Sequence, residues 1–123
     1  ISFLTVKENM CLTSQIKGKK VDEKELNQVL KLLGLEHKKD SFANELSGGQ
    51  QQRVAIGRAI LAHADIILAD EPTGNLDGEN AENVMDILKV LNGKGKTIVL
   101  VTHDLKIANY ADRIIRLEQG KIV

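Results

Sequence analysis

The sequence of 123 residues predicts an α/β protein, with helices dominating the first half and a parallel sheet in the second. Three observations support this class. Short apolar runs at 66–69 and 97–101 each end abruptly in polar residues, as the strands of a covered parallel sheet do. A helical apolar pattern separates the two runs, which predicts a right-handed crossover. Helical patterns account for most of the first 62 residues.

Two helices are expected before the middle of the chain. Thr5 and Glu8 have the spacing of a capping box, so a short helix should follow Thr5. Asp22 and Glu25 begin a second helix, and Gly34 is its expected end. The apolar residues of this helix recur at i, i+3, i+4 and i+7 and therefore form one face. They are Leu26, Val29, Leu30 and Leu33.

A third helix should begin after Ser47 and run to about Ala62. Ser47 and Gln50 have the spacing of a capping box, and the free N–H groups of such a helix start favour an anion. Gly48 and Gly49 leave room for a ligand, although each costs about 1 kcal/mol in a helix relative to Ala. We therefore predict a helix start that faces a phosphate. The alternative is an ordinary capped helix on the surface.

Three basic side chains of this region have expected partners. Arg53 and Arg58 can serve salt bridges or phosphates, and salt bridges are the favoured interpretation. His63 follows the helix and is expected to interact with its C-terminal dipole.

The second half reads as strand, helix, strand, helix, strand. Residues 66–69 should form a strand buried on both faces, 97–101 a second strand and 113–117 a third. Asp77 is expected to cap the long helix after the first strand, and Asp104 a short helix after the second. The apolar stripe of the long helix consists of Ala81, Val84, Met85, Leu88 and Leu91.

Polar groups follow both of the first two strands. If these strands are parallel, Asp70, Glu71 and His103 share the carboxyl edge of the sheet, where open α/β sheets bind ligands. Successive side chains on a strand point in opposite directions, so Asp70 and Glu71 should differ in role. One can hold Mg²⁺ while the other acts as a base on water. The alternatives are a simple loop start for the acids and a local hydrogen bond for His103.

Composition excludes several classes of function. Lys+Arg and Asp+Glu are balanced at 17 each, so no basic field indicates nucleic acid. Only Phe3, Phe42 and Tyr110 are aromatic, which argues against a base-stacking surface. The apolar runs are too short to cross a bilayer, and the single Cys11 fits a reducing compartment. Because the first residue is Ile, we expect a piece of a longer chain.

Four motifs resemble those of ATP-binding cassette (ABC) ATPases. Leu46-Ser47-Gly48-Gly49-Gln50 resembles the signature motif, and residues 66–71 resemble the Walker B strand with its catalytic glutamate. Asn75-Leu76-Asp77 resembles the D-loop, and His103 the switch histidine. All four occur in the family's order and spacing. Residues 69–77 look most like the branch that serves lipoprotein-releasing, macrolide and antimicrobial-peptide exporters.

The resemblance implies a P-loop NTPase-like fold: residues 1–62 as a helical subdomain and 63–123 as the second half of the catalytic core. It also implies ATP and Mg²⁺ as cofactors and a head-to-tail dimer of two such domains. Ser47, Gly48, Gly49 and Gln50 would contact the γ-phosphate held by the other subunit. Asp70 would help to hold Mg²⁺, Glu71 would polarise the attacking water, and His103 would contact the γ-phosphate. Asp77 would lie across the dimer interface.

The chain departs from the family in lacking two of its motifs. No G-x-x-x-x-G-K-[ST] motif is present, and neither is the glutamine loop that precedes the helical subdomain. We therefore expect a fragment that is inactive alone and prone to self-association, from a parent that hydrolyses ATP.

The function implied for the parent is transport. It would be a cytoplasmic ATPase subunit held at the inner face of the membrane by a transmembrane permease, with no nucleic acid partner. The alternative is a non-transport ABC ATPase, either ribosome-associated or of the DNA-repair and chromosome-organising type. The chain lacks the sustained heptads of the latter.

Overall fold

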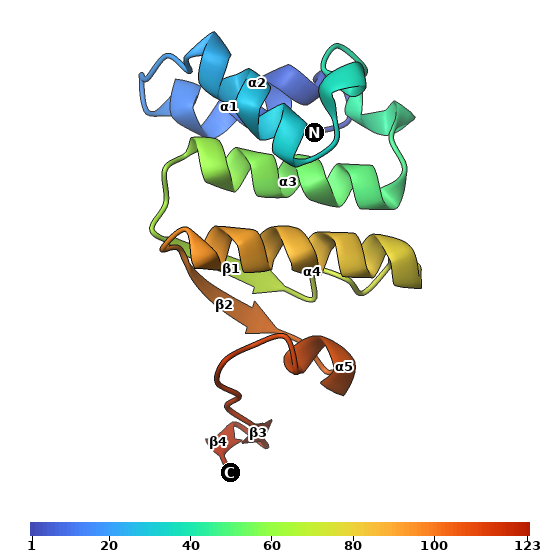
Figure 1. Cartoon of the computed structure of the whole chain (residues 1–123), viewed down its shortest axis with the longest axis vertical. Coiled ribbons are helices and arrows are strands. Elements are labelled where there is room, and N and C mark those ends of the chain that lie inside the picture. The colour runs from blue at the N-terminus through green and yellow to red at the C-terminus, as the bar shows by residue number, and fades with distance from the viewer.

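The computed structural model describes all 123 residues. The first half holds α1 (Val6–Ile16), α2 (Glu23–Leu32) and α3 (Gly48–Leu61), with short 3₁₀ turns at Glu36–Lys38 and Ala43–Glu45. The second half holds β1 (Ile66–Asp70), α4 (Gly78–Gly93), β2 (Thr97–Val101), α5 (Leu105–Ala108), β3 (Leu117–Glu118) and β4 (Lys121–Ile122). Figure 1 shows α1 and α2 above α3, and α4 between α3 and the strands. No helix combines the length and the apolar character that crossing a bilayer requires.

The predicted starts of α1 and α2 are correct in position, although only one is capped by its side chain. The Thr5 hydroxyl accepts a hydrogen bond from the Glu8 N–H at 3.2 Å, and the Glu8 carboxylate accepts one from the Thr5 N–H at 2.8 Å. Asp22 stands at the N-cap of α2 but makes no capping hydrogen bond. The predicted apolar face of α2 is buried, and Gly34 ends this segment with a φ of 66°.

One hydrophobic cluster of 19 buried residues joins the two halves of the chain. α1 packs most closely on α3, and Gly57 permits this approach, because a Cβ there would lie 2.6 Å from Met10 Cε. The cluster continues through α4, where Val84 and Leu88 are buried. The division into a helical subdomain and a partial core stays a prediction, since the cluster spans residue 62.

β1 and β2 form a parallel pair, as predicted, with Ile66 opposite Thr97 and Asp70 opposite Val101. The prediction that β1 is buried on both faces is wrong. Only Ile67 of β1 is buried, whereas Leu68 is 76% exposed. Because successive side chains of a strand point to opposite faces, one face meets the helices and the other is open.

The third strand, predicted at 113–117, does not join this sheet. Residues 113–116 have no regular structure, and β3 pairs antiparallel with β4 in a separate hairpin. Apolar residues are therefore exposed in this segment, including Ile114 and Ile115. The apolar pattern alone does not form a strand here, because neither β1 nor β2 pairs with this segment, and its Arg116 carbonyl accepts instead from the Val123 N–H at 3.1 Å.

His63 also has a different partner from the one expected. It follows α3 in the left-handed region, with a φ of 53°. His63 Nε2 lies 3.0 Å from Glu25 Oε1 of α2. His63 thus contacts an acid of a neighbouring helix, and its interaction with the dipole of α3 stays a prediction.

The open face of the β1–β2 sheet predicts self-association of this chain. Exposed apolar side chains cover it, because Ile66, Leu68, Val99 and Val101 all point outward. Large apolar patches of this kind promote association in water. Sedimentation velocity should show species larger than a monomer at high concentration.

A charge on that face should reverse the association. Leu68→Glu is expected to shift the distribution toward monomer, whereas Val90→Glu, at an exposed valine of α4 outside this face, should not. A wild-type chain that stays monomeric at high concentration would contradict the prediction.

Candidate functional site

The carboxyl ends of β1 and β2 bring together the acid and the imidazole predicted from the sequence. Glu71 follows β1 directly, and His103 follows β2 by two residues. Glu71 Oε1 lies 2.7 Å from His103 Nδ1 and accepts a hydrogen bond from the His103 backbone N–H at 3.0 Å. The two side chains converge as expected at the sheet edge, and we refer to them as the acid–imidazole pair.

The backbone of Glu71 is held in an uncommon conformation. Its φ is 44°, in the left-handed region that few residues other than glycine occupy. Its N–H donates to the Val101 carbonyl at 2.8 Å, and its carbonyl accepts from the Gly74 N–H at 3.1 Å. Non-glycine residues in such conformations cluster at functional sites, where the surrounding structure imposes them. Here the conformation turns Glu71 toward the end of β2.

Thr102 completes the surroundings of the carboxylate. Its hydroxyl donates to Glu71 Oε2 at 3.4 Å and accepts from the Asp104 N–H at 3.1 Å. Thr102 was not among the predicted site residues. Its place between a predicted strand end and His103 was the only available signal.

The pair shifts the protonation of both partners. The hydrogen bond from His103 lowers the pKa of Glu71, and the same hydrogen bond raises the pKa of His103. Glu71 is therefore ionised near neutral pH, and His103 holds its proton to a higher pH than a free imidazole. His103 is 87% exposed in its side chain, so its Nε2 is accessible to an anion from solvent.

A pH titration of His103 should report this pair. Because the pKa of His103 is raised above 6.5, the imidazole stays protonated at pH 6.5 and loses its charge only as the pH rises through the raised pKa. The stabilisation from the ion pair is lost over that range. At acid pH the ion pair is lost when Glu71 becomes protonated, as the pH falls through the lowered pKa of this carboxyl, which lies below 4.5. In Glu71→Gln, the NMR-monitored pKa of His103 should fall, whereas Glu82→Gln should leave it unchanged. An unchanged titration in Glu71→Gln would show that the pair does not form.

Asp70 is the last residue of β1 and is exposed. The chain contains no group of three or more side chains placed to hold a metal ion. Mg²⁺ at phosphate sites is held by one or two carboxylates, with phosphate oxygens and water as its other ligands. A single accessible carboxylate next to Glu71 fits that donor set, so Asp70 stays the predicted magnesium ligand.

The predicted phosphate-facing turn, Ser47–Gln50, has the expected geometry. Ser47 Oγ accepts from the Gln50 N–H at 3.2 Å, and Gln50 Oε1 accepts from the Ser47 N–H at 3.0 Å. The N–H groups of Gly48 and Gly49 have no acceptor within α3, because they precede its first intrahelical bond. Gly48 is exposed. We call these four residues the signature turn.

Gly49 differs from Gly48 in being buried. A Cβ at Gly49 would overlap Asn80 Oδ1 and lie 2.6 Å from Asn80 Cγ. Packing against the first turn of α4 is therefore a second reason for glycine here, and contact of Gly49 with a phosphate stays a prediction. Asn80 was not among the predicted site residues, although its place three residues after the Asp77 cap marks it as a capping position.

Asp77 caps α4, as predicted, and lies close to the signature turn. Its Oδ1 accepts hydrogen bonds from the Asn80 N–H and from Asn80 Nδ2, both at 2.9 Å. Leu76 Cδ2 lies 3.6 Å from the position that a Cβ of Gly48 would take. The Asp77 loop, residues 75–77, therefore borders the signature turn in the same chain.

The salt bridges predicted for Arg53 and Arg58 do not form. Arg53 donates to the Leu33 carbonyl at 3.1 Å and to the Gly49 carbonyl at 3.3 Å. The Leu33 carbonyl lies at the end of α2, whereas the Gly49 carbonyl belongs to α3 itself, so the first of these hydrogen bonds fastens α2 to α3. Arg58 has no acidic partner, and its Nε is buried without a hydrogen bond.

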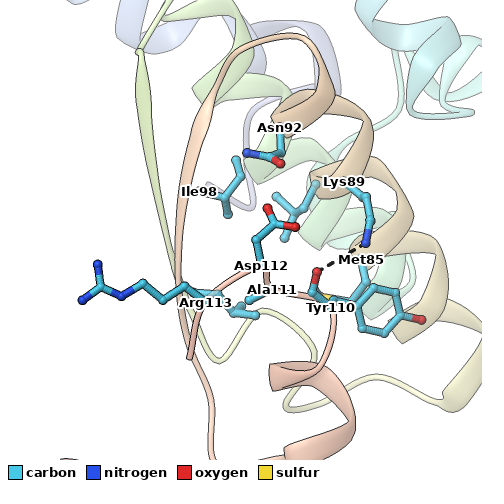
Figure 2. Close-up of a pocket in the computed structure, with 10 residues that line it drawn as sticks. Met85, Lys89, Asn92, Ile98, Tyr110, Ala111, Asp112 and Arg113 are labelled. Atoms are coloured by element: carbon cyan, nitrogen blue, oxygen red, sulfur yellow. Dashed lines mark hydrogen bonds between the residues drawn. The ribbon is translucent and has the colours of Figure 1, made fainter. Parts of the chain in front are cut away.

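A separate hollow of about 220 Å³ lies between α4, β2 and residues 110–113. Figure 2 shows it, with Lys89 Nζ donating to the Tyr110 carbonyl at 3.5 Å across one side. None of the predicted site residues lines it. Its apolar lining consists of Met85, Leu88, Ile98, Leu100, Tyr110 and Ala111. It is distinct from the acid–imidazole pair.

The motifs, their placement and the fold agree with a known family. The family profile described as "ABC transporter" matches residues 1–74. The chain belongs to the ABC transporter family. This membership confirms the resemblance on which the site assignments were based.

Relatives in several organisms align with all or nearly all of this chain. The macrolide export ATP-binding/permease protein MacB of Campylobacter jejuni is 51% identical over 125 residues, which cover all of this chain and 20% of that protein. The ABC transporter ATP-binding protein MJ1508 of Methanocaldococcus jannaschii, itself uncharacterized, is 46% identical over all of this chain and 56% of its own length. The cell division ATP-binding protein FtsE of Streptococcus pneumoniae is 43% identical, over 97% of this chain and 53% of its own length.

Solved structures show the same fold. The dimeric cassette MJ0796, described as a bacterial ABC transporter cassette, superimposes with a TM-score of 0.84 at 43% identity, over 99% of this chain and 56% of that one. The ADP conformation of the cassette MJ1267 gives a TM-score of 0.86 at 29% identity, over 99% of this chain and 54% of that one. The predicted fold class, part of an α/β ABC cassette, is confirmed. The chain spans about half the length of these cassettes.

Proposed function

We propose that this chain is the signature-motif and Walker B part of an ATP-hydrolysing subunit that powers a membrane transporter. The observation that carries the proposal is the acid–imidazole pair: Glu71 and His103 meet at the carboxyl edge of two parallel strands. That edge is where open α/β sheets bind ligands. Family membership supports the nucleotide as that ligand.

The two sides of the pair suit different tasks. Glu71 Oε1 is occupied by His103, whereas Oε2 has only the long hydrogen bond from Thr102 at 3.4 Å. Oε2 is therefore the oxygen that can take a proton from an attacking water. His103 keeps Nδ1 on Glu71 and can donate Nε2–H to a phosphate oxygen, which stabilises the negative charge that develops there.

ATP and Mg²⁺ fit the residues around this pair. Bound Mg²⁺ would neutralise charge on the β- and γ-phosphates, and Asp70 would hold it. A relative of the same fold was solved as a dimer bound to ADP and Pi, in a post-hydrolysis state. The chain has no G-x-x-x-x-G-K-[ST] sequence, so hydrolysis is proposed for the protein that carries this chain.

A second copy would supply the other phosphate contacts. The signature turn lies at the start of α3, and α4 separates α3 from the strands that present Glu71 and His103 (Figure 1). This arrangement favours a head-to-tail dimer in which the turn of one copy meets the nucleotide held by the other. The dimeric cassette MJ0796 supports this arrangement. Asp77 would then lie at the interface, beside the turn.

The transporter would be an exporter. The MacB relatives are named for macrolide export and combine ATP-binding and permease functions. We therefore propose a permease partner in the membrane and a position of this chain at its cytoplasmic face.

A charge at the signature turn tests the proposal in the protein that carries this chain. Gly48→Asp is expected to abolish most Mg-ATP hydrolysis, because a carboxylate would stand where a phosphate should bind. The same carboxylate interacts favourably with the helix N-terminus, by about 0.3–1 kcal/mol, so the fold should be kept. Gly93→Asp, at the exposed end of α4, is the control. Full hydrolysis by Gly48→Asp would overturn the proposed role of the turn.

A further inference from the structure

The signature turn and the Asp77 loop are joined by one side chain that neither motif contains. Asn80, in the first turn of α4, packs on Gly49 so closely that any Cβ there would overlap its amide oxygen. Its Nδ2 donates to Asp77 Oδ1 at 2.9 Å. One amide therefore contacts both of the loops that the proposed dimer would bring to the interface.

This contact exceeds what capping of α4 requires. An Asp cap needs only the backbone N–H of the third helical residue, and the Asn80 N–H already provides it at 2.9 Å. In a capping box the side chain at this position accepts a hydrogen bond from the cap backbone. Asn80 instead donates to the cap carboxylate, so Asp77 Oδ1 holds two donors and its orientation is fixed.

The neighbouring glycine shows that the contact is specific. A Cβ at Gly48 would meet only Leu76 Cδ2, at an ordinary 3.6 Å. The turn is thus open at Gly48, where a ligand would approach, and closed at Gly49, where Asn80 lies.

We infer that Asn80 is a positioning residue that fastens the Asp77 loop to the signature turn, so that the two move as one unit. The inference deepens the proposed function and rests on it. When the turn engages a phosphate held by a second copy, Asp77 is carried into a fixed place at the same interface. Asn80 itself touches no nucleotide and acts through Asp77.

The test is a double-mutant cycle on ATP turnover in the protein that carries this chain. Asn80→Ala is expected to lower turnover by roughly 10–100-fold, the range that a misplacement of about 1 Å can cost. Asp77→Ala should lower it at least as much. If Asn80 acts through Asp77, adding Asn80→Ala to Asp77→Ala should change turnover by less than about twofold, because coupled residues are not additive.

Controls separate this role from general damage to the fold. Asn83→Ala, one helical turn further along α4, should leave turnover unchanged. Asn80→Asp keeps the shape of the side chain but removes the Nδ2 donor, and should lose turnover as Asn80→Ala does. Urea unfolding of each variant identifies any that lose turnover through instability.

The outcomes are distinguishable. Additive losses in an active protein, or full turnover in Asn80→Asp, would overturn the role of Asn80 and leave the proposed function intact. A wild-type protein without ATP turnover would overturn the proposed function and this inference with it.

Discussion

Glu71→Gln is expected to lower ATP turnover by about 10²–10⁴-fold in the protein that carries this chain, the usual contribution of a positioned general base. The amide keeps the shape of the carboxylate and can still meet His103. It cannot take a proton from water, because an amide oxygen is a far weaker base. Nucleotide binding should persist, so we also expect the variant to accumulate as a nucleotide-bound dimer.

The measurement is steady-state phosphate release with saturating Mg-ATP, followed by gel filtration with nucleotide. Glu82→Gln, an exposed acid on α4, is the matched control and should hydrolyse ATP at the wild-type rate. Wild-type turnover in Glu71→Gln would remove Glu71 from the role of base.

Gly49→Ala is expected to destabilise the chain by about 1–3 kcal/mol, the usual cost of forcing extra atoms into a packed site. The added methyl would overlap the Asn80 amide and lie 3.0 Å from Asn80 Cβ. To accept it, the Asn80 side chain must give up its hydrogen bond to Asp77, or the first turn of α4 or the start of α3 must shift. Urea unfolding followed by circular dichroism measures the loss.

Gly48→Ala is the matched control, because the same methyl is added one residue away. It meets only Leu76 Cδ2 at 3.6 Å, so its stability should be equal to that of wild type or higher. Asn80→Gly should recover most of the stability lost in Gly49→Ala, since it removes all three atoms that the methyl would meet. Equal stability of Gly48→Ala and Gly49→Ala would contradict the packing described here.

Features set by neighbours in sequence could be predicted. The capping boxes at Thr5 and Ser47 and the cap at Asp77 each depend on residues within three positions, and all three form. The meeting of Glu71 and His103, 32 residues apart, was predictable because parallel strands place their ends together.

Features set by distant partners could not be predicted. The sequence around Arg53 does not show that the carbonyl of Leu33, 20 residues away, would be its acceptor. Likewise, the sequence around Gly49 does not show that the Asn80 side chain packs against this glycine. The strand expected at 113–117 has the right composition, but a strand also needs an adjacent backbone to pair with.

Mixing two inactive variants tests the shared site most directly. Gly48→Asp inactivates the signature turn, and Glu71→Gln removes the base. In a dimer of one copy of each variant, one site would combine the intact base of the first copy with the intact turn of the second. The other site would carry both substitutions. Equal amounts of the two variant proteins should recover about a quarter of wild-type ATP turnover, because half of the dimers would be mixed and each would hold one working site of two. A mixture as inactive as either variant alone, with mixed dimers shown to form, would contradict a site built from two copies.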